Sequence, residues 1–203
     1  FEPKVPSHGA SSTITFCANL HPAIQLSVLD QSTPKRASIL DSMNLWINIA
    51  LDELIEAIKR VDIVVINDGE ATMLAKTDNL VEAAKQVQSM ASIPTLIIKK
   101  GEHGVLALHG DDFIALPAYP SDAVVDPTGC GDTFAGTLAA CLANGDGAVS
   151  TTELREALVH ATVSASFTLE DFGTKGIESI STDAYRNRLM RYCAITGTSI
   201  DAS

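Results

Sequence analysis

The sequence has few aromatic residues, a deficit of basic residues and no long apolar run. Phe, Trp and Tyr make up 5% of the 203 residues, and 14 Lys and Arg stand against 25 Asp and Glu, a net charge of −11. Such an acidic chain argues against nucleic acid or an anionic membrane as a partner. No apolar run reaches membrane-spanning length and no signal peptide is visible. We therefore expect a cytoplasmic protein with no nucleic-acid and no membrane partner.

Cysteine is also scarce. Four cysteines, Cys17, Cys130, Cys141 and Cys193, form neither a CxxC pair nor a metal-ligand cluster with histidine. This spacing favours buried free thiols in a reducing compartment. A hydrophobic content of 46% and a charged content of 19% are typical of a globular protein. No repeat or linker interrupts the chain, so we expect a single domain over residues 1–203.

Strand-like and helix-like patterns alternate along the chain. Continuous apolar runs at 62–67 and 95–99 are typical of strands covered on both faces, and 13–18 and 37–40 predict further strands. Residues 105–108 and 113–116 flank a glycine turn and predict a hairpin. The helical patterns lie at 22–29, 46–58, 69–76, 79–91, 153–167 and 182–193. This alternation predicts a mostly parallel sheet with helices on both faces.

The most informative stretch runs from Asp126 to Gly136, Asp-Pro-Thr-Gly-Cys-Gly-Asp-Thr-Phe-Ala-Gly. It follows the apolar run 123–125, which predicts a strand, and leads into a helical pattern over 133–144. Amides at a helix start have no partner inside the helix and attract phosphate oxygens. An aspartate on such an anion-binding turn is useful if it takes a proton from a hydroxyl that attacks the phosphate. An ordinary capped glycine turn is the structural alternative.

This stretch closely resembles the second signature of the ribokinase-like (PfkB) carbohydrate kinase family, Asp-x-x-Gly-Ala-Gly-Asp-Thr-Phe-x-Gly. Cys130 and Thr137 depart from it, since the family prefers a small residue at each position. The resemblance implies a three-layer αβα sandwich and a phosphotransferase that moves the γ-phosphoryl group of ATP to an alcohol of a sugar-like substrate. It makes Asp132 the general base and the amides of Gly129, Cys130 and Gly131 the anion hole.

A second group of residues lies before this signature. Asn67-Asp68-Gly69-Glu70 resembles the Asn-x-x-Glu motif of the family, which would give Asn67 and Glu70 a role in placing Mg²⁺ and phosphate. A simple helix cap is the alternative. Asp41, Asn67, Lys99 and Asp126 each fall at or after the end of a predicted strand, where α/β sheets bind ligands.

The segment from Lys99 to Gly104 lies where the family has a Thr-x-Gly-x-x-Gly turn that touches the nucleotide. Gly101 and Gly104 match this pattern, whereas Lys99 replaces the threonine and would supply positive charge to an acidic site. A solvent-exposed lysine pair, Lys99 and Lys100, is the structural alternative.

Further nucleotide and ion ligands follow from the resemblance. Asp126 matches an aspartate that binds a monovalent cation in many members, so K⁺ is an expected ion, with Thr128 beside it on the nucleotide side. His160 and Ser164 belong to a helix that resembles the adenine-binding wall of the family, although they equally suit a core helix.

The resemblance covers residues 13–193 and only the C-terminal part of the family. The first glycine signature, the sugar contacts and the lid are absent from the sequence, so we expect an N-terminally incomplete fold with an apolar sheet edge and no nameable substrate. A catalytically silent nucleotide-binding pseudokinase and a nucleoside or vitamin-precursor kinase of the same fold are the alternatives. A homodimer is left open.

Overall fold

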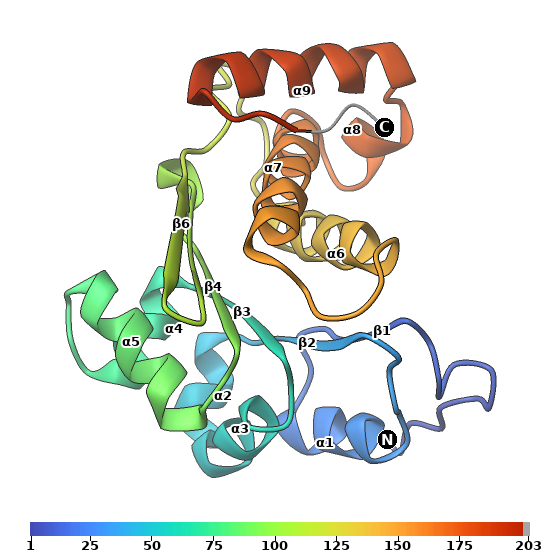
Figure 1. Ribbon diagram of the computed structural model, residues 1–203, viewed down its shortest axis with the longest axis vertical. Coiled ribbons are helices and arrows are strands. Elements are labelled where there is room, and N and C mark those ends of the chain that lie inside the picture. The colour runs from blue at the N-terminus through green and yellow to red at the C-terminus, as the bar shows by residue number, and fades with distance from the viewer. Residues whose placement is uncertain (201–203) are drawn as a thin grey trace. The chain divides into compact units, whose positions relative to one another are not determined.

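The computed structural model describes residues 1–200 and divides into two compact units (Figure 1). The first unit contains the sheet and the second is mainly helical. The first comprises Phe1–Gly101, Val105–Ala115 and Asp146–Ala148, and the second comprises Glu102–Gly104, Leu116–Gly145 and the chain from Val149 onward. A single domain over residues 1–203 remains a prediction.

The first unit is built on a six-stranded sheet in the order β1-β2-β3-β4-β5-β6. Strands β1 to β4 are parallel, and β5 pairs with β4 in the antiparallel sense, so the predicted mostly parallel sheet is present. The strands are β1 (Ile14–Cys17), β2 (Ala37–Asp41), β3 (Ile63–Asn67), β4 (Thr95–Lys99), β5 (Val105–His109) and β6 (Asp112–Leu116). The helices of this unit are α1 (Pro22–Asp30), α2 (Asn44–Ile49), α3 (Leu51–Ile58), α4 (Asp68–Ala75) and α5 (Leu80–Ala91).

One face of this sheet packs against α1, α3, α4 and α5 (Figure 1). The contact is a core of aliphatic side chains, among them Leu40, Val64 and Leu96 from the strands and Leu54 and Val87 from the helices. Burial of such side chains stabilises the fold by roughly 1.5–3 kcal/mol each. The packed sheet fixes the carboxyl ends of three adjacent parallel strands, β2, β3 and β4, at one edge.

The second unit consists of four helices and the segments that join them. They are α6 (Cys130–Ala143), α7 (Thr151–Thr168), α8 (Lys175–Glu178) and α9 (Thr182–Thr196). The Ser150 hydroxyl caps α7 by accepting a hydrogen bond from the Glu153 amide at 3.2 Å, as the capping-box spacing predicts. Among residues 1–200, none of the helices is both long enough and apolar enough to cross a membrane.

Three sequence predictions about these elements are wrong. The helix expected over 46–58 is interrupted at Ala50, whose φ of −147° and ψ of 42° are not helical, and it divides into α2, which buries no residue, and α3, which buries Leu54, Ala57 and Ile58. The expected strand at 123–125 is irregular, since Val124 and Val125 are 63% and 46% exposed. Helix α6 begins three residues before Thr133, so Gly131 and Asp132 already lie in its first turn.

Candidate active site

Three of the four predicted strand-end residues meet at the carboxyl edge of the first unit's sheet. Asn67 ends β3 directly opposite Lys99 at the end of β4. The Lys99 ammonium lies 3.2 Å from Oδ1 of Asp41, at the end of β2. The Asp41 side chain is 7% exposed and that of Lys99 is 21% exposed, so the charge of Lys99 is committed to a partner within the sheet edge. Asp126, the fourth residue, follows no strand.

Asn67 and Glu70 form a complete capping box at the start of α4. The Glu70 amide donates to Asn67 Oδ1 at 2.8 Å, and the Asn67 amide donates back to Glu70 Oε2 at 3.1 Å. The Asn67 side-chain amide also donates to Glu70 Oε1 at 2.6 Å. Both carboxylate oxygens of Glu70 therefore already accept hydrogen bonds. The helix cap that was the alternative reading of this motif is therefore present, and the metal role of the motif remains a prediction.

Glu70 is one of the most deeply buried acids of the first unit, with 2% of its surface exposed. Burial raises its pKa from 4.5 to about 7, and the hydrogen bond from the Asn67 amide and the positive charge of Lys99 oppose this rise. Close to neutral pH, Glu70 is thus divided between its neutral and charged forms. A carboxylate in this state attracts a cation more weakly than a solvated one.

The start of α6 in the second unit is open by comparison. Gly129 occupies the N-cap position with φ of 85°, a conformation that L side chains rarely adopt, and no side chain caps the helix. Within the described residues 1–200, the amides of Gly129 and Gly131 donate to no acceptor. Asp132, the third helical residue, is exposed. The turn therefore presents free N–H groups and a carboxylate to solvent, which are the groups that the predicted anion hole and base require.

Cys130, between these glycines, is engaged with the protein. Its amide donates to the Pro127 carbonyl at 3.2 Å, and its thiol donates to the Ala165 carbonyl at 3.6 Å. Burial, helped by the nearby Asp126 charge, raises the pKa of the thiol, which keeps it neutral. Cys130 consequently anchors the turn to α7, and its amide is free for an anion only if the Pro127 bond opens.

Asp126 and Thr128 form a small turn of their own. Oδ1 of Asp126 accepts a hydrogen bond from the Thr128 amide at 2.9 Å, and this bond lowers the pKa of the carboxyl. The Asp126 carboxylate is therefore ionised near neutral pH. Over the described part of the chain, no group of three or more His, Cys, Asp or Glu side chains is placed to hold a metal ion.

His160 and Ser164 of α7 face α9. The His160 ring stacks on Tyr185 with centroids 6.1 Å apart, and its Nδ1 forms a 2.7 Å hydrogen bond with the Tyr185 hydroxyl. Burial raises the pKa of the Tyr185 hydroxyl, and the nearby Ser164 side chain opposes this rise. Burial lowers the pKa of His160, so the ring is neutral at pH 7. These contacts give both residues a packing role, and contact with adenine remains a prediction.

Gly101 and Gly104 flank a short 3₁₀ turn, Gly101–His103, and both have positive φ. A Cβ on Gly104 would lie 2.1 Å from the Leu116 carbonyl oxygen, whereas a Cβ on Gly101 would meet nothing within 4 Å. Both the positive φ and the close backbone packing therefore require a glycine at position 104. Gly101 is required only by its backbone conformation and lies exposed.

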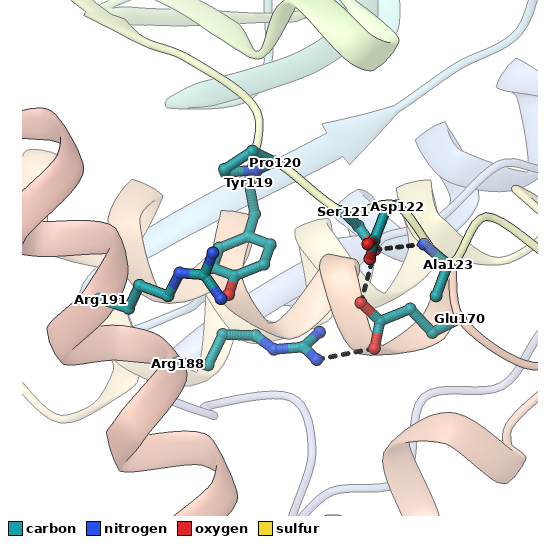
Figure 2. Close-up of a pocket in the computed structure, with 8 residues that line it drawn as sticks. All are labelled: Tyr119, Pro120, Ser121, Asp122, Ala123, Glu170, Arg188 and Arg191. Carbon is teal, nitrogen blue, oxygen red and sulfur yellow. Dashed lines mark hydrogen bonds and ion pairs between the residues drawn. The ribbon is translucent and has the colours of Figure 1, made fainter.

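The second unit also holds a pocket that the sequence analysis missed (Figure 2). Its volume is about 520 Å³, and it is lined by Tyr119, Pro120, Ser121, Asp122, Ala123, Glu170, Arg188 and Arg191. These residues come from the segment before the signature, from the end of α7 and from α9. These three segments are far apart in sequence, so no local sequence pattern indicates that they contact one another.

A family model described as pfkB family carbohydrate kinase matches residues 27–180. The cytidine kinase of Thermococcus kodakarensis is 31% identical over 140 residues, which cover 66% of this chain and 49% of that protein. A fructokinase from Vibrio cholerae, solved with fructose, ADP and a calcium ion, has a TM-score of 0.77 at 17% identity and covers 91% of this chain and 63% of its own.

A nucleoside kinase of Methanocaldococcus jannaschii, described as an archaeal member of the ribokinase family, has a TM-score of 0.71 at 20% identity, over 94% of this chain and 59% of its own. These likenesses confirm the ribokinase-like α/β fold. The chain spans about half the length of the cytidine kinase and about six-tenths of these two solved chains. The family model covers well over half of the sequence, and the chain belongs to the pfkB family of carbohydrate kinases.

Proposed function

We propose that the chain carries the phosphoryl-transfer site of an ATP-dependent kinase that acts on an alcohol of a sugar or nucleoside. The observation that carries this proposal is the open start of α6, where two free amides and the exposed Asp132 share one helical turn. Membership of a carbohydrate kinase family supports it. Asp132 would accept the proton of the attacking hydroxyl, a role worth roughly 10²–10⁴-fold in rate.

The amides of Gly129 and Gly131 would stabilise the phosphoryl oxygens as negative charge develops. Preorganised N–H groups of this kind need no reorganisation during the reaction, and the α6 dipole adds to their effect. The Cys130 amide would join them on release of its bond to Pro127. Residues of a rigid helix start hold such donors in place better than a mobile loop.

ATP brings Mg²⁺ to such a reaction, and the residues of the first unit fit an indirect role toward that ion. Each Glu70 oxygen accepts one hydrogen bond and retains a lone pair, so Glu70 can accept a further bond from a metal-bound water. Mg²⁺ commonly keeps several waters in protein sites. We assign this role to Glu70 and Asn67. We assign the binding of a K⁺ ion to Asp126, with Thr128 beside it. Lys99, Gly101, Gly104, His160 and Ser164 are assigned to the nucleotide side.

The acceptor is a sugar or a nucleoside. A cytidine kinase and a nucleoside kinase among the similar proteins make nucleosides the first class to test. The four free cysteines accord with a reducing cytoplasm as the compartment.

The test is ADP formation by the purified full-length protein that carries this chain, with ATP, Mg²⁺ and either cytidine, ribose or fructose. We expect at least one acceptor to raise ADP formation well above the acceptor-free rate. No increase with any acceptor, together with undetectable ATP binding, would overturn the proposal. ATP binding with no acceptor-dependent turnover would favour the alternative, a catalytically silent nucleotide-binding protein.

A further inference from the structure

The segment that leads into the α6 turn has no regular structure of its own. Residues 117–126 contain neither a strand nor a helix, and Val124 and Val125 are largely exposed. Yet this segment delivers Asp126 and, six residues later, Asp132 to the turn. Because rates of phosphoryl transfer depend on placement, whatever holds the segment also sets the geometry of the site.

Helix α7 holds the end of this segment closest to the turn. The amides of Val125 and Asp126 both donate to the Leu169 carbonyl, at 2.9 and 3.2 Å. Leu169 directly follows the last residue of α7. Helix α9 holds the other end, where the Tyr192 hydroxyl donates to the Pro117 carbonyl at 2.6 Å.

The middle of the segment is held by a relay of three side chains (Figure 2). The Ser121 hydroxyl donates to Oε1 of Glu170 at 2.6 Å, and the other Glu170 oxygen accepts from Arg188 at 2.7 Å. The Arg188 and Glu170 side chains are only 17% and 23% exposed. A charge-assisted bond at this depth is stronger than an exposed ion pair.

Arg188 is itself fixed on all sides. A second nitrogen of its guanidinium donates to the Ser166 hydroxyl at 3.0 Å. The guanidinium carbon lies 3.6 Å from the centre of the Phe167 ring and 5.0 Å from that of Tyr119. A planar, stacked guanidinium offers little freedom to its partners, so Glu170 is presented to Ser121 in one orientation.

We propose that Arg188 and Glu170 are positioning residues, which hold residues 117–126 and thereby set the α6 turn for phosphoryl transfer. The catalytic part of this inference rests on the proposed function, whereas the tether itself does not. Arg188 lies on α9, beyond residues 27–180 that the family model matches. Helix α9, which lies outside the matched region, therefore contributes to the placement of the α6 turn.

Arg191 supplies a matched control. It lies on the same helix and lines the same pocket, but within residues 1–200 it makes no hydrogen bond or ion pair with the segment. Arg191→Ala removes the same type of side chain and the same charge as Arg188→Ala, and it leaves the hydrogen bonds among Ser121, Glu170 and Arg188 intact. Ser121→Ala removes the bond to Glu170 and also the acceptor of the Ala123 amide at 3.3 Å, so exchange at Val125 and Asp126 is its informative readout.

Amide hydrogen exchange of the full-length protein tests the tether. We expect exchange at residues 121–126 to accelerate about 10-fold in Arg188→Ala and severalfold in Ser121→Ala, with the sheet and the centre of α6 unchanged. Arg191→Ala should match the wild type, and Arg188→Lys should lie between. Uniform acceleration across the second unit in both Arg188→Ala and Ser121→Ala, or an equal local effect in Arg191→Ala, would overturn the inference.

Kinetics test the catalytic part. We expect kcat of Arg188→Lys and Ser121→Ala to fall about 3- to 10-fold while KM for ATP stays within about twofold, because placement rather than binding is lost. Unchanged kcat beside a loosened segment would overturn the positioning role. A wild-type protein that transfers no phosphoryl group would instead refute the proposed function, and the exchange data would still decide whether the tether exists.

Discussion

The first turns of helices α4 and α6 have the same sequence pattern but differ in the burial and hydrogen bonding of their acidic residue. Each has a glycine as second helical residue, Gly69 or Gly131, and an acid as third, Glu70 or Asp132. In α4 the acid is 2% exposed and bonded through both oxygens, whereas in α6 the acid is exposed and no side chain caps the helix.

The difference arises at the N-cap. Asn67 has an extended backbone and a side chain that both caps α4 and binds Glu70. Gly129 has a positive φ and no side chain, so nothing folds back over the first turn of α6. The N-cap residue thus distinguishes a helix start that is closed by side chains from one that no side chain caps. Loss of the acid at α4 should therefore change the free energy of unfolding as well as its proposed bond to a metal-bound water, whereas loss of the acid at α6 should change turnover alone.

The largest expected effect is that of Asp132→Asn. We expect kcat to fall by about 10²–10⁴-fold, because the base is lost while the shape of the turn is kept. The urea midpoint should remain that of the wild type, since the side chain is exposed. Asp52→Asn, also an exposed acid in the first turn of a helix, is the control and should retain full activity. Turnover of Asp132→Asn close to that of the wild type would remove the contrast between the two turns.

The next effect is the loss of stability in Asn67→Ala. The substitution removes the cap of α4 and one hydrogen bond to a buried carboxylate, so we expect the free energy of unfolding to fall by about 2–3 kcal/mol. Asn79→Ala, which removes an exposed cap of α5, should cost only about 1 kcal/mol. Urea titration measures both, and equal losses would mean that the Glu70 contact adds nothing.

The pH dependence of stability gives a third, intermediate effect. The folded-state pKa of Glu70, about 7, lies above its ordinary value of 4.5. The folded state therefore binds the extra proton between these values, and the free energy of unfolding should fall as the pH rises from 4.5 to 7. We expect the fall in the free energy of unfolding between pH 4.5 and pH 7 to be smaller in Glu70→Gln than in the wild type, by about 1–3 kcal/mol. An identical slope in both proteins, measured by urea titration across this range, would contradict the burial effect.

The smallest effects concern two glycines at and within α6. Gly136 lies inside the helix with open space around its Cβ position, so Gly136→Ala should stabilise the protein by about 0.5–1 kcal/mol. Gly129→Ala should destabilise it by about 1–2 kcal/mol, because φ there is 85° although the space is nearly open. Thermal unfolding of the two variants measures both changes, and a destabilised Gly129→Ala beside a stabilised Gly136→Ala would show that position 129 requires glycine for its backbone conformation.

The sequence predicted the sheet well because its strands are buried. Continuous apolar runs located β3 and β4 within a residue of their bounds, and Pro22 and Ser150 marked the starts of α1 and α7. The exposed run at Val124 and Val125 misled the prediction, since an apolar pattern says nothing about whether a neighbouring strand is present to pair with it.

The candidate site was only partly predictable for a related reason. The residues of the α6 turn are contiguous, so a local motif revealed them. Glu170 is separated in sequence from Arg188 by 18 positions and from Ser121 by 49 positions. No periodic pattern links residues at such separations. The tyrosine partner of His160 was missed in the same way.

The most direct measurement is the amide spectrum of ¹⁵N-labelled protein as ADP is added. If the α6 turn holds the phosphates, the resonances of Gly129 and Gly131 shift in proportion to bound ADP. The glycines of two other exposed turns, Gly110 and Gly197, serve as controls and stay in place. Saturation with ADP that leaves Gly129 and Gly131 unmoved would contradict the assignment of this turn to the phosphoryl group.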